Sequence, residues 1–229
     1  MTKQIAQVCV YIFKNDDGHS ADQRLQEAAE HYCREMAGRW PCEEALAGNL
    51  ADRLRVERTA AGKPYFPDCP GLHFSISHSG AYWACAMGNV NVGLDLQEHV
   101  TGKNETKEEA AVRYRKMAHR FFHPLEAEFV EWNSYEHFFT VWTAREAYVK
   151  NTGQGIDKYF SEHCVVPQNR TMWEQIAVEP PGSKSKELDE QCGSSWTALG
   201  KWFCSVDFRE DYSLCVCAEE AFNWMILEC

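Results

Sequence analysis

Two acids and a cluster of hydroxyl and imidazole groups are the residues of this chain that could do chemistry together. Residues 74–80 hold Ser77 and His78, and one short hairpin later Asp95 lies in an alternating strand pattern. Glu146 follows 51 positions after Asp95. Magnesium in proteins typically takes one or two carboxylates and fills its other positions with water and substrate phosphate oxygens. The two acids therefore predict a magnesium site suited to phosphate chemistry.

Each acid also fits a purely structural interpretation. Asp95 alone fits a strand residue that is paired with a base. Glu146 and Lys150 have the spacing and order of a favourable helical ion pair, which stabilises a helix by about 0.2–0.5 kcal/mol. Only the fold can bring the two acids together, so both interpretations stay open at the level of sequence.

The adjacent Ser77 and His78 do not match a nucleophile and its base. Neighbouring residues on a strand point to opposite faces, and the serine lacks the Gly-x-Ser-x-Gly context of a nucleophile elbow. A hydroxyl and an imidazole beside a turn are better suited to contact a phosphate. Lys63 can add a point charge and Arg55 a bidentate clamp, although either can equally be a solvated surface charge.

Alternation with a period of two predicts the strands. The alternation places Asp95 and Gln97 on one face of their strand. We expect strands over residues 4–13, 72–77, 82–87 and 90–97, and a closing antiparallel pair over residues 196–208 and 212–219.

Capping signals predict where the helices begin and end. The boxes Ser20 with Gln23 and Thr106 with Glu109 are typical of helix starts. Pro124 suits the first turn of a further helix. The helix that carries Glu146 should end at Gly153, because glycine tolerates the left-handed conformation that follows many helices. Glu146 lies there on an apolar stripe, a local inconsistency that is typical of functional sites.

The order of these elements indicates an α+β fold built from two similar halves. Strand, helix and hairpin occur in the first part and again in the second. We place the boundary between residues 89 and 90, which gives an N-terminal half over residues 1–89 and a C-terminal half over residues 90–229. Residues 62–65, 67–70 and 180–186 are expected to be loops.

Composition bounds the partners and the compartment. The 229 residues are 45% hydrophobic with a formal net charge of −11, which predicts a compact protein and argues against nucleic acid as a partner. The 11 cysteines contain no CxxC pair and are expected to be buried thiols in the cytoplasm, although Cys215 and Cys217 could share a metal. The apolar run near the N-terminus is too short to span a membrane.

Five motifs in order carry a resemblance to a known family. The chain resembles the 4'-phosphopantetheinyl transferases, of the longer, pseudo-dimeric type that activates surfactin synthetase and similar enzymes. The resemblance extends from about Arg55 to Ala218. The motifs occupy residues 62–64, 74–80, 93–96, 120–122 and 142–150.

The resemblance implies a fold, a reaction and its substrates. The fold would contain two α+β halves with antiparallel sheets related by a pseudo-twofold, in a chain that acts as a monomer. The enzyme would transfer the phosphopantetheine arm of coenzyme A to a serine of an acyl, peptidyl or aryl carrier protein and release adenosine 3',5'-bisphosphate. Neither nucleic acid nor a membrane would be a partner.

The resemblance also implies roles for individual residues. Asp95 and Glu146 would bind Mg²⁺ at the pyrophosphate, and Lys150 would contact the pyrophosphate. Ser77 and His78 would contact coenzyme A near its phosphorylated ribose, and Arg55 and Lys63 would hold the nucleotide end. Three general bases stay open: Glu146, Lys150 and a metal-bound hydroxide.

Gln97 departs from the family pattern. Many long-type members have a second acid at this position, two residues after the strand aspartate. Gln97 can offer a carbonyl oxygen to the metal or orient a metal-bound water, or it can simply be tolerated. This departure leaves a coenzyme A or carrier-protein binder without turnover open as another function. A third candidate is a different metal-dependent phosphotransferase or pyrophosphatase.

Overall fold

The computed structural model describes residues 5–16, 18–36, 54–132, 135–155, 162–176, 194–209 and 211–229. The loop expected over residues 180–186 lies outside these residues. The described part is an α+β structure, which confirms the predicted fold class.

The first sheet contains four strands in the order β10-β1-β5-β4. Neighbours are antiparallel except β10, which runs parallel to β1, so the expectation of purely antiparallel sheets is wrong at this edge. The prediction also missed β10 altogether. The strands are β1 (Ala6–Lys14), β4 (His73–Ser79), β5 (Tyr82–Gly88) and β10 (Phe222–Glu228).

The second sheet also contains four strands, in the order β6-β9-β8-β7, and all its pairs are antiparallel. The prediction of one strand over residues 196–208 is wrong. Leu199 and Gly200 both have positive φ, which is the geometry of a two-residue hairpin turn. The strands are β6 (Val92–Glu98), β7 (Ser194–Ala198), β8 (Lys201–Phe208) and β9 (Tyr212–Ala218).

A small two-stranded sheet corrects the loop expected over residues 62–65. β2 (Glu57–Arg58) pairs with β3 (Pro64–Tyr65). The hairpin closes through the backbone, since the amide of Thr59 donates to the carbonyl of Lys63 at 2.9 Å.

Both predicted capping boxes are present at the starts of helices. Ser20 caps α1 (Ala21–Glu35), and Thr106 caps α4 (Lys107–Phe121). Pro124 is the first residue of α5 (Pro124–Trp132). Gly153, with φ of 71°, ends α6 (His137–Thr152) as expected. A 3-10 turn η2 (Arg170–Met172) leads into the short α7 (Trp173–Ile176).

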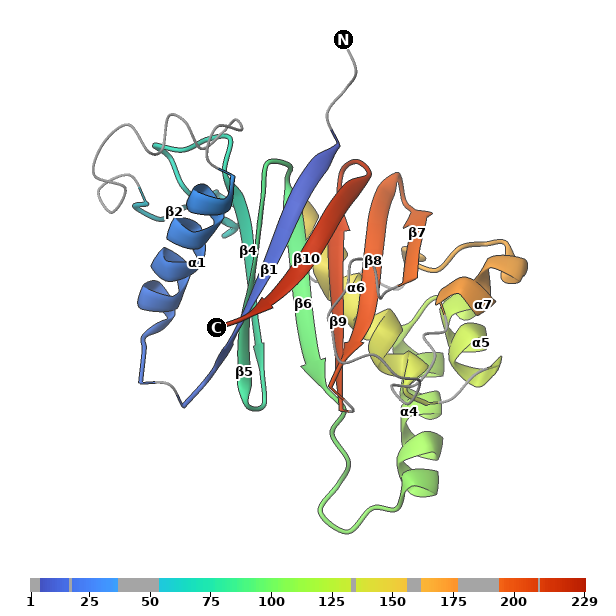
Figure 1. Cartoon of the computed structure of the whole chain (residues 1–229). Coiled ribbons are helices and arrows are strands. Elements are labelled where there is room, and N and C mark those ends of the chain that lie inside the picture. Colours follow the sequence, from blue (N-terminus) through green and yellow to red (C-terminus); the bar gives the residue numbers. More distant parts are fainter. Residues whose placement is uncertain are drawn as a thin grey trace.

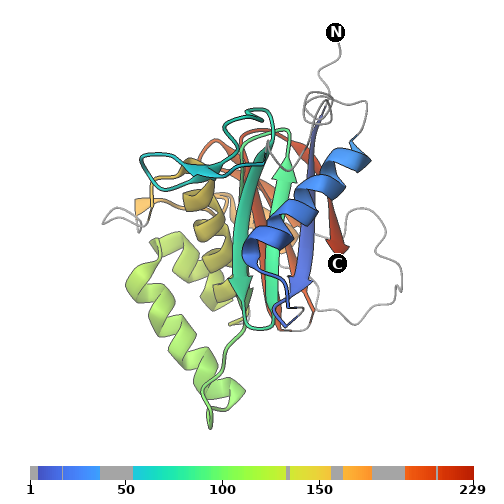
Figure 2. The ribbon, with the colours of Figure 1, turned by 90° about the vertical axis from the view of Figure 1, so that its left-hand side faces the viewer.

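The two sheets lie between the helices (Figures 1 and 2). Alternate residues of β1 and β5 pack against α1, and the others face β6 and β9 of the second sheet. The opposite side of the second sheet packs against α4, α5 and α6. No helix in the described ranges is both long and apolar enough to cross a membrane.

The two halves share one strand order. In the first half the order is β1-β5-β4, and in the second it is β6-β9-β8. The pseudo-twofold relation and the boundary between residues 89 and 90 stay predictions. The C-terminal strand β10 nevertheless returns to pair with β1, so the end of the chain lies in the first sheet.

Helix α6 lies directly against β6 because Gly93 has no side chain. A Cβ at Gly93 would overlap the carbonyl oxygen of Ala147 on α6. The same contact places Asp95, on the same face of β6 as Gly93, beneath the helix that carries Glu146 and Lys150.

Gly93→Ala should therefore separate the two elements. Overpacking against backbone atoms should cost about 3 kcal/mol or more, which lowers the thermal midpoint by about 6 °C or more. Differential scanning calorimetry measures this decrease in the thermal midpoint. Gly102→Ala is the control, because the nearest atoms to its Cβ would be side-chain atoms of Glu105, at 3.2 Å or more, and not backbone atoms. Equal midpoints for the two variants would contradict the close packing.

Candidate functional site

A hollow between β4, β6 and α6 brings most of the predicted site residues together. Its volume is about 410 Å³. It contains both predicted acids, although they are far apart in the sequence. The lining residues are Ile76, Ser77, His78, Asp95, Leu96, Gln97, Trp142, Glu146 and Lys150.

Asp95, Ser77 and Lys150 form a hydrogen-bonded triangle in this hollow. The Lys150 ammonium donates to Oδ1 of Asp95 at 2.8 Å and to Oγ of Ser77 at 3.1 Å. The Ser77 hydroxyl donates to the same carboxylate oxygen at 2.7 Å. Asp95 is only 6% exposed, so these partners offset much of the cost of burying its charge. Asp95 therefore forms an ion pair with Lys150, and Lys150 itself lines the hollow.

Glu146 lies near Asp95 and shares its environment. Burial raises the pKa of Glu146, and the negative charge of Asp95 raises it further. Burial also raises the pKa of Asp95, against the opposing effects of Lys150 and Ser77. Of the two structural interpretations, the pairing of Asp95 with a base is present as the Asp95–Lys150 ion pair, and no ion pair of Glu146 with Lys150 is found among the described residues. Two repelling carboxylates therefore share one positive neighbour.

His78 and Gln97 lie at the rim of the hollow. His78 is exposed. It directly follows Ser77 on β4, so its side chain points to the opposite face of the strand. The Gln97 amide nitrogen donates to Oγ of Ser79 at 3.3 Å and to the carbonyl of Glu98 at 3.1 Å. Its carbonyl oxygen remains as a candidate ligand.

The residues of the hollow fit a hard divalent cation. Asp95 and Glu146 offer carboxylate oxygens, Gln97 offers an amide oxygen, and the mutual repulsion of the two acids would be relieved by positive charge. Among the described residues no group of three or more His, Cys, Asp or Glu could hold a metal. A cation here would thus depend on water and phosphate oxygens for its remaining positions, as magnesium usually does.

Lys63 and Arg55 lie outside this hollow. The Lys63 ammonium donates to Asn91 Oδ1, to the carbonyl of Asn151 at 2.8 Å and to that of Val92 at 3.2 Å. Burial lowers the pKa of Lys63 to about 8. Lys63 thus binds one carbonyl oxygen near the C-terminal end of α6 and one at the start of β6.

Arg55 is exposed and forms ion pairs with two acids of its own half. Its guanidinium lies 2.6 Å from Glu57 and 3.8 Å from Asp68. The nucleotide-contact roles of Arg55 and Lys63 stay predictions, and both cations would need to exchange these partners for a phosphate.

A buried ion pair that the sequence did not indicate fixes the position of α6. Arg145, next to Glu146, pairs with Glu126 of α5, and both side chains are at most 1% exposed. Arg145 also donates to the carbonyl of His163 at 3.0 Å, and Glu126 accepts from the amide of Val165 at 2.8 Å. The sequence signal that could have predicted this ion pair is the charged residue within the apolar stripe of each helix.

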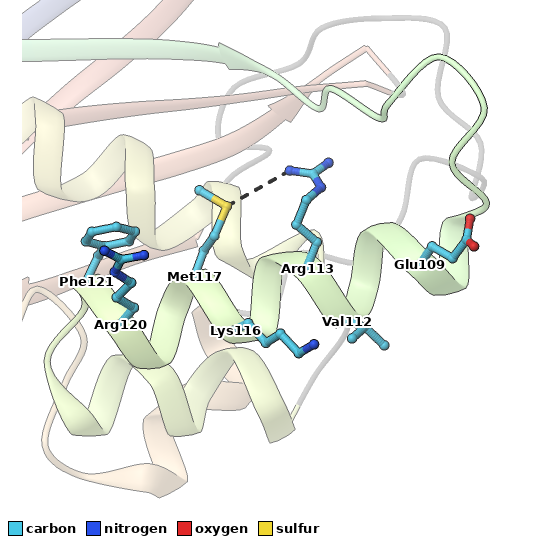
Figure 3. Close-up of a pocket in the computed structure, with 7 residues that line it drawn as sticks. All are labelled: Glu109, Val112, Arg113, Lys116, Met117, Arg120 and Phe121. Atoms are coloured by element: carbon cyan, nitrogen blue, oxygen red, sulfur yellow. Dashed lines mark hydrogen bonds between the residues drawn. The ribbon is translucent and has the colours of Figure 1, made fainter.

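A second hollow lies on the outer side of α4 (Figure 3). Its volume is about 400 Å³, and it contains none of the predicted site residues. Val112 and Phe121 are 50% and 47% exposed there. The Arg120 guanidinium lies 5.1 Å from the centre of the Phe121 ring. This surface is apolar and basic, and has no arrangement suited to catalysis.

Comparison with known proteins identifies the family. The model of the 4'-phosphopantetheinyl transferase superfamily matches residues 91–217. A 4'-phosphopantetheinyl transferase of Bacillus subtilis is 26% identical over 162 residues, which cover 69% of this chain and 59% of that protein. The transferase Sfp of Bacillus subtilis strain 168 is 25% identical over 71% of this chain and 72% of its own length.

A protein of Nostoc is also similar, over a shorter segment. The 4'-phosphopantetheinyl transferase HetI of Nostoc is 32% identical over 56% of this chain and 55% of its own length. The matched segment thus spans between about half and three quarters of these relatives. The segment that the family model matches includes the strand of Asp95 and the helix of Glu146 and Lys150. The chain belongs to the 4'-phosphopantetheinyl transferase superfamily.

Proposed function

We propose that this protein transfers the 4'-phosphopantetheine arm of coenzyme A to a serine of an acyl, peptidyl or aryl carrier protein, with Mg²⁺ as cofactor. The observation that carries the proposal is the hollow that joins Asp95, Glu146 and Lys150. This is the arrangement that a pyrophosphate needs, because carboxylates can hold a metal beside a cation that neutralises phosphate charge. We further propose that the protein acts as a monomer in the cytoplasm.

The reaction exchanges a phosphoanhydride bond of coenzyme A for a phosphoester bond to the carrier serine. The carrier serine oxygen bonds to the phosphorus that bears the pantetheine arm, and the bond from that phosphorus to the bridging oxygen of the pyrophosphate breaks. The bridging oxygen and its electron pair leave with adenosine 3',5'-bisphosphate, while the serine proton passes to a base. Bound Mg²⁺ would neutralise charge on the pyrophosphate.

The protein residues would bind and orient the reacting groups. Lys150, which is 30% exposed while paired with Asp95, can turn its ammonium toward a phosphate oxygen. Asp95 and Glu146 would hold the metal, with Gln97 as a neutral ligand or a partner of a metal-bound water. His78, exposed at the rim, would contact coenzyme A.

Intact-mass spectrometry tests the proposal. Purified protein is incubated with coenzyme A, Mg²⁺ and a panel of apo-carrier proteins, and we expect one carrier to gain the mass of one phosphopantetheine arm on its serine. Thermal stabilisation by coenzyme A without any mass gain would instead indicate a binding protein. Cleavage of coenzyme A without a carrier would indicate a pyrophosphatase.

The hollow on α4 is the surface we propose for the carrier protein. Lys116 and Arg120 are exposed there and have no ion pair with a described residue, in a chain of net charge −11. Next to Phe121, the ring of Phe122 lies 6.5 Å from that of Trp142, which lines the catalytic hollow. A carrier with an acidic helix bound to α4 would therefore lie close to the site.

Reversing both charges should weaken carrier binding selectively. Lys116→Glu combined with Arg120→Glu is expected to raise the KM for the carrier about tenfold, equivalent to about 1.4 kcal/mol, because charge complementarity is replaced by repulsion. The KM for coenzyme A should stay unchanged. Arg34→Glu on α1, at the opposite side of the molecule (Figure 1), is the control. If the KM for the carrier rose as much in Arg34→Glu, the carrier would bind elsewhere on the protein.

A further inference from the structure

Three serines at alternate positions of β4 accept hydrogen bonds from three alternate backbone amides of β6. We name this set the serine ladder. Its rungs are Ser75 Oγ with the amide of Leu94 at 2.9 Å, Ser77 Oγ with that of Leu96 at 3.1 Å, and Ser79 Oγ with that of Glu98 at 3.0 Å.

The ladder replaces a backbone pairing between the two sheets. β4 and β6 are edge strands of different sheets, so the amides of β6 on this side have no strand carbonyl as partner. Buried amides need a partner, and a serine hydroxyl supplies one. The two-residue period of a strand keeps all three hydroxyls on one face of β4.

Two of the three rungs, those of Ser77 and Ser79, also touch the side chain that precedes the rung's amide on β6. The Ser77 hydroxyl donates to Asp95 at 2.7 Å. Ser79 Oγ accepts from the amide nitrogen of Gln97 at 3.3 Å. At the remaining rung the preceding residue is Gly93, so Ser75 has no side chain to contact. The ladder therefore contacts two candidate metal ligands and leaves one rung as a purely structural joint.

The hydrogen bonds of Ser77 are fully used. A hydroxyl has two acceptor positions and one donor. The amide of Leu96 and the ammonium of Lys150 occupy the acceptor positions, and the O–H donates to Asp95. While its O–H donates to Asp95, Ser77, at 6% exposure, has no hydrogen left to donate to a phosphate oxygen.

We propose that Ser77 is a positioning residue that holds the Asp95 carboxylate toward the metal, that Ser79 does the same for Gln97, and that Ser75 only joins the strands. The inference rests on the proposed metal role of Asp95. It differs from the expectation that Ser77 contacts coenzyme A.

The test compares Ser77→Ala with Ser75→Ala, a matched control that is equally buried, at 5%, and removes one rung. Mn²⁺ is titrated into the complex with coenzyme A and followed by electron paramagnetic resonance. Partners that orient metal ligands typically contribute 10–100-fold to affinity, so Ser77→Ala should weaken Mn²⁺ binding at least about tenfold. Its kcat should fall, while the KM for coenzyme A stays the same. Ser75→Ala should change none of these.

Two further measurements separate positioning from structure. Amide hydrogen exchange should accelerate at Leu96 in Ser77→Ala and at Leu94 in Ser75→Ala, since each variant removes one acceptor. Ser77→Thr, which keeps the hydroxyl, should restore Mn²⁺ binding. If Ser77→Ala does not fold, Ser77→Cys keeps the volume with a weaker donor and should show an intermediate loss of affinity.

Several results would overturn the inference. Equal Mn²⁺ affinities in Ser77→Ala and Ser75→Ala would reduce the ladder to a structural joint. A raised KM for coenzyme A with unchanged Mn²⁺ affinity would make Ser77 a substrate contact. A wild-type protein that binds no Mn²⁺ would refute the metal role and this inference together. One that binds Mn²⁺ but modifies no carrier would refute only the proposed function.

Discussion

Asp95→Asn is expected to abolish transfer to the carrier, with a loss in kcat of about 10³-fold or more. The substitution keeps the shape of the side chain and removes its charge. A metal that neutralises phosphate charge contributes several kcal/mol to the transition state, and about 1.4 kcal/mol corresponds to a factor of ten in rate. Lys150 would also lose its ionic partner at 2.8 Å. Single-turnover kinetics with a carrier and coenzyme A measure the loss.

Asp207→Asn is the matched control for this change. Asp207 lies on β8, and burial raises its pKa as it does for Asp95. It also contacts a serine, since the Ser213 hydroxyl donates to it at 3.3 Å. It does not line the catalytic hollow. We expect Asp207→Asn to retain activity, and wild-type turnover in Asp95→Asn would remove Asp95 as a ligand.

Glu146→Gln is expected to abolish transfer and, at the same time, to stabilise the metal-free protein at pH 7. Burial and the charge of Asp95 raise the pKa of Glu146 above its usual value. The folded chain therefore retains this proton at pH values where the unfolded chain has lost it. Between the two pKa values the folded state binds more protons, so the free energy of unfolding falls as pH rises. Glutamine has no charge to bury at this position, so Glu146→Gln removes this loss of folding free energy at pH 7.

Thermal unfolding from pH 4 to pH 7, with and without Mg²⁺, measures both effects. Without the metal, Glu146→Gln should have the higher midpoint at pH 7 and a smaller decrease with rising pH. With Mg²⁺ and coenzyme A the wild type should gain stability and the variant should not. Glu136→Gln, at the start of the same helix and outside the hollow, should behave as wild type. A variant less stable than wild type at pH 7 would mean that Glu146 is favourably paired in the metal-free protein.

Local chemistry determined most of the elements from sequence. The capping boxes at Ser20 and Thr106 are hydrogen-bonded within four residues, so no distant contact was needed to predict them. The left-handed end of α6 at Gly153 is equally local. By contrast, β10 lies beside β1, more than 200 positions away, and nothing in its own pattern specifies that partner.

At the turn of Leu199 the local sequence preference is overridden by tertiary structure. A leucine with φ of 53° contradicts the local preference of a branched side chain, and the pairing of β7 with β8 compensates for this. Sequence patterns therefore predicted one long strand where the structure has a hairpin.

By itself the sequence determined which residues could do the chemistry: Asp95, Glu146, Lys150, Ser77 and His78 are residue types suited to a metal and a phosphate, and all five line one hollow. Only the tertiary structure decided their partners. It assigned Lys150 to Asp95 instead of Glu146, because Gly93 lets α6 lie against β6. It also paired Ser77 with Asp95, because the serines of β4 satisfy the edge amides of β6. Spacing along one chain cannot specify contacts between elements that meet only when two sheets pack together.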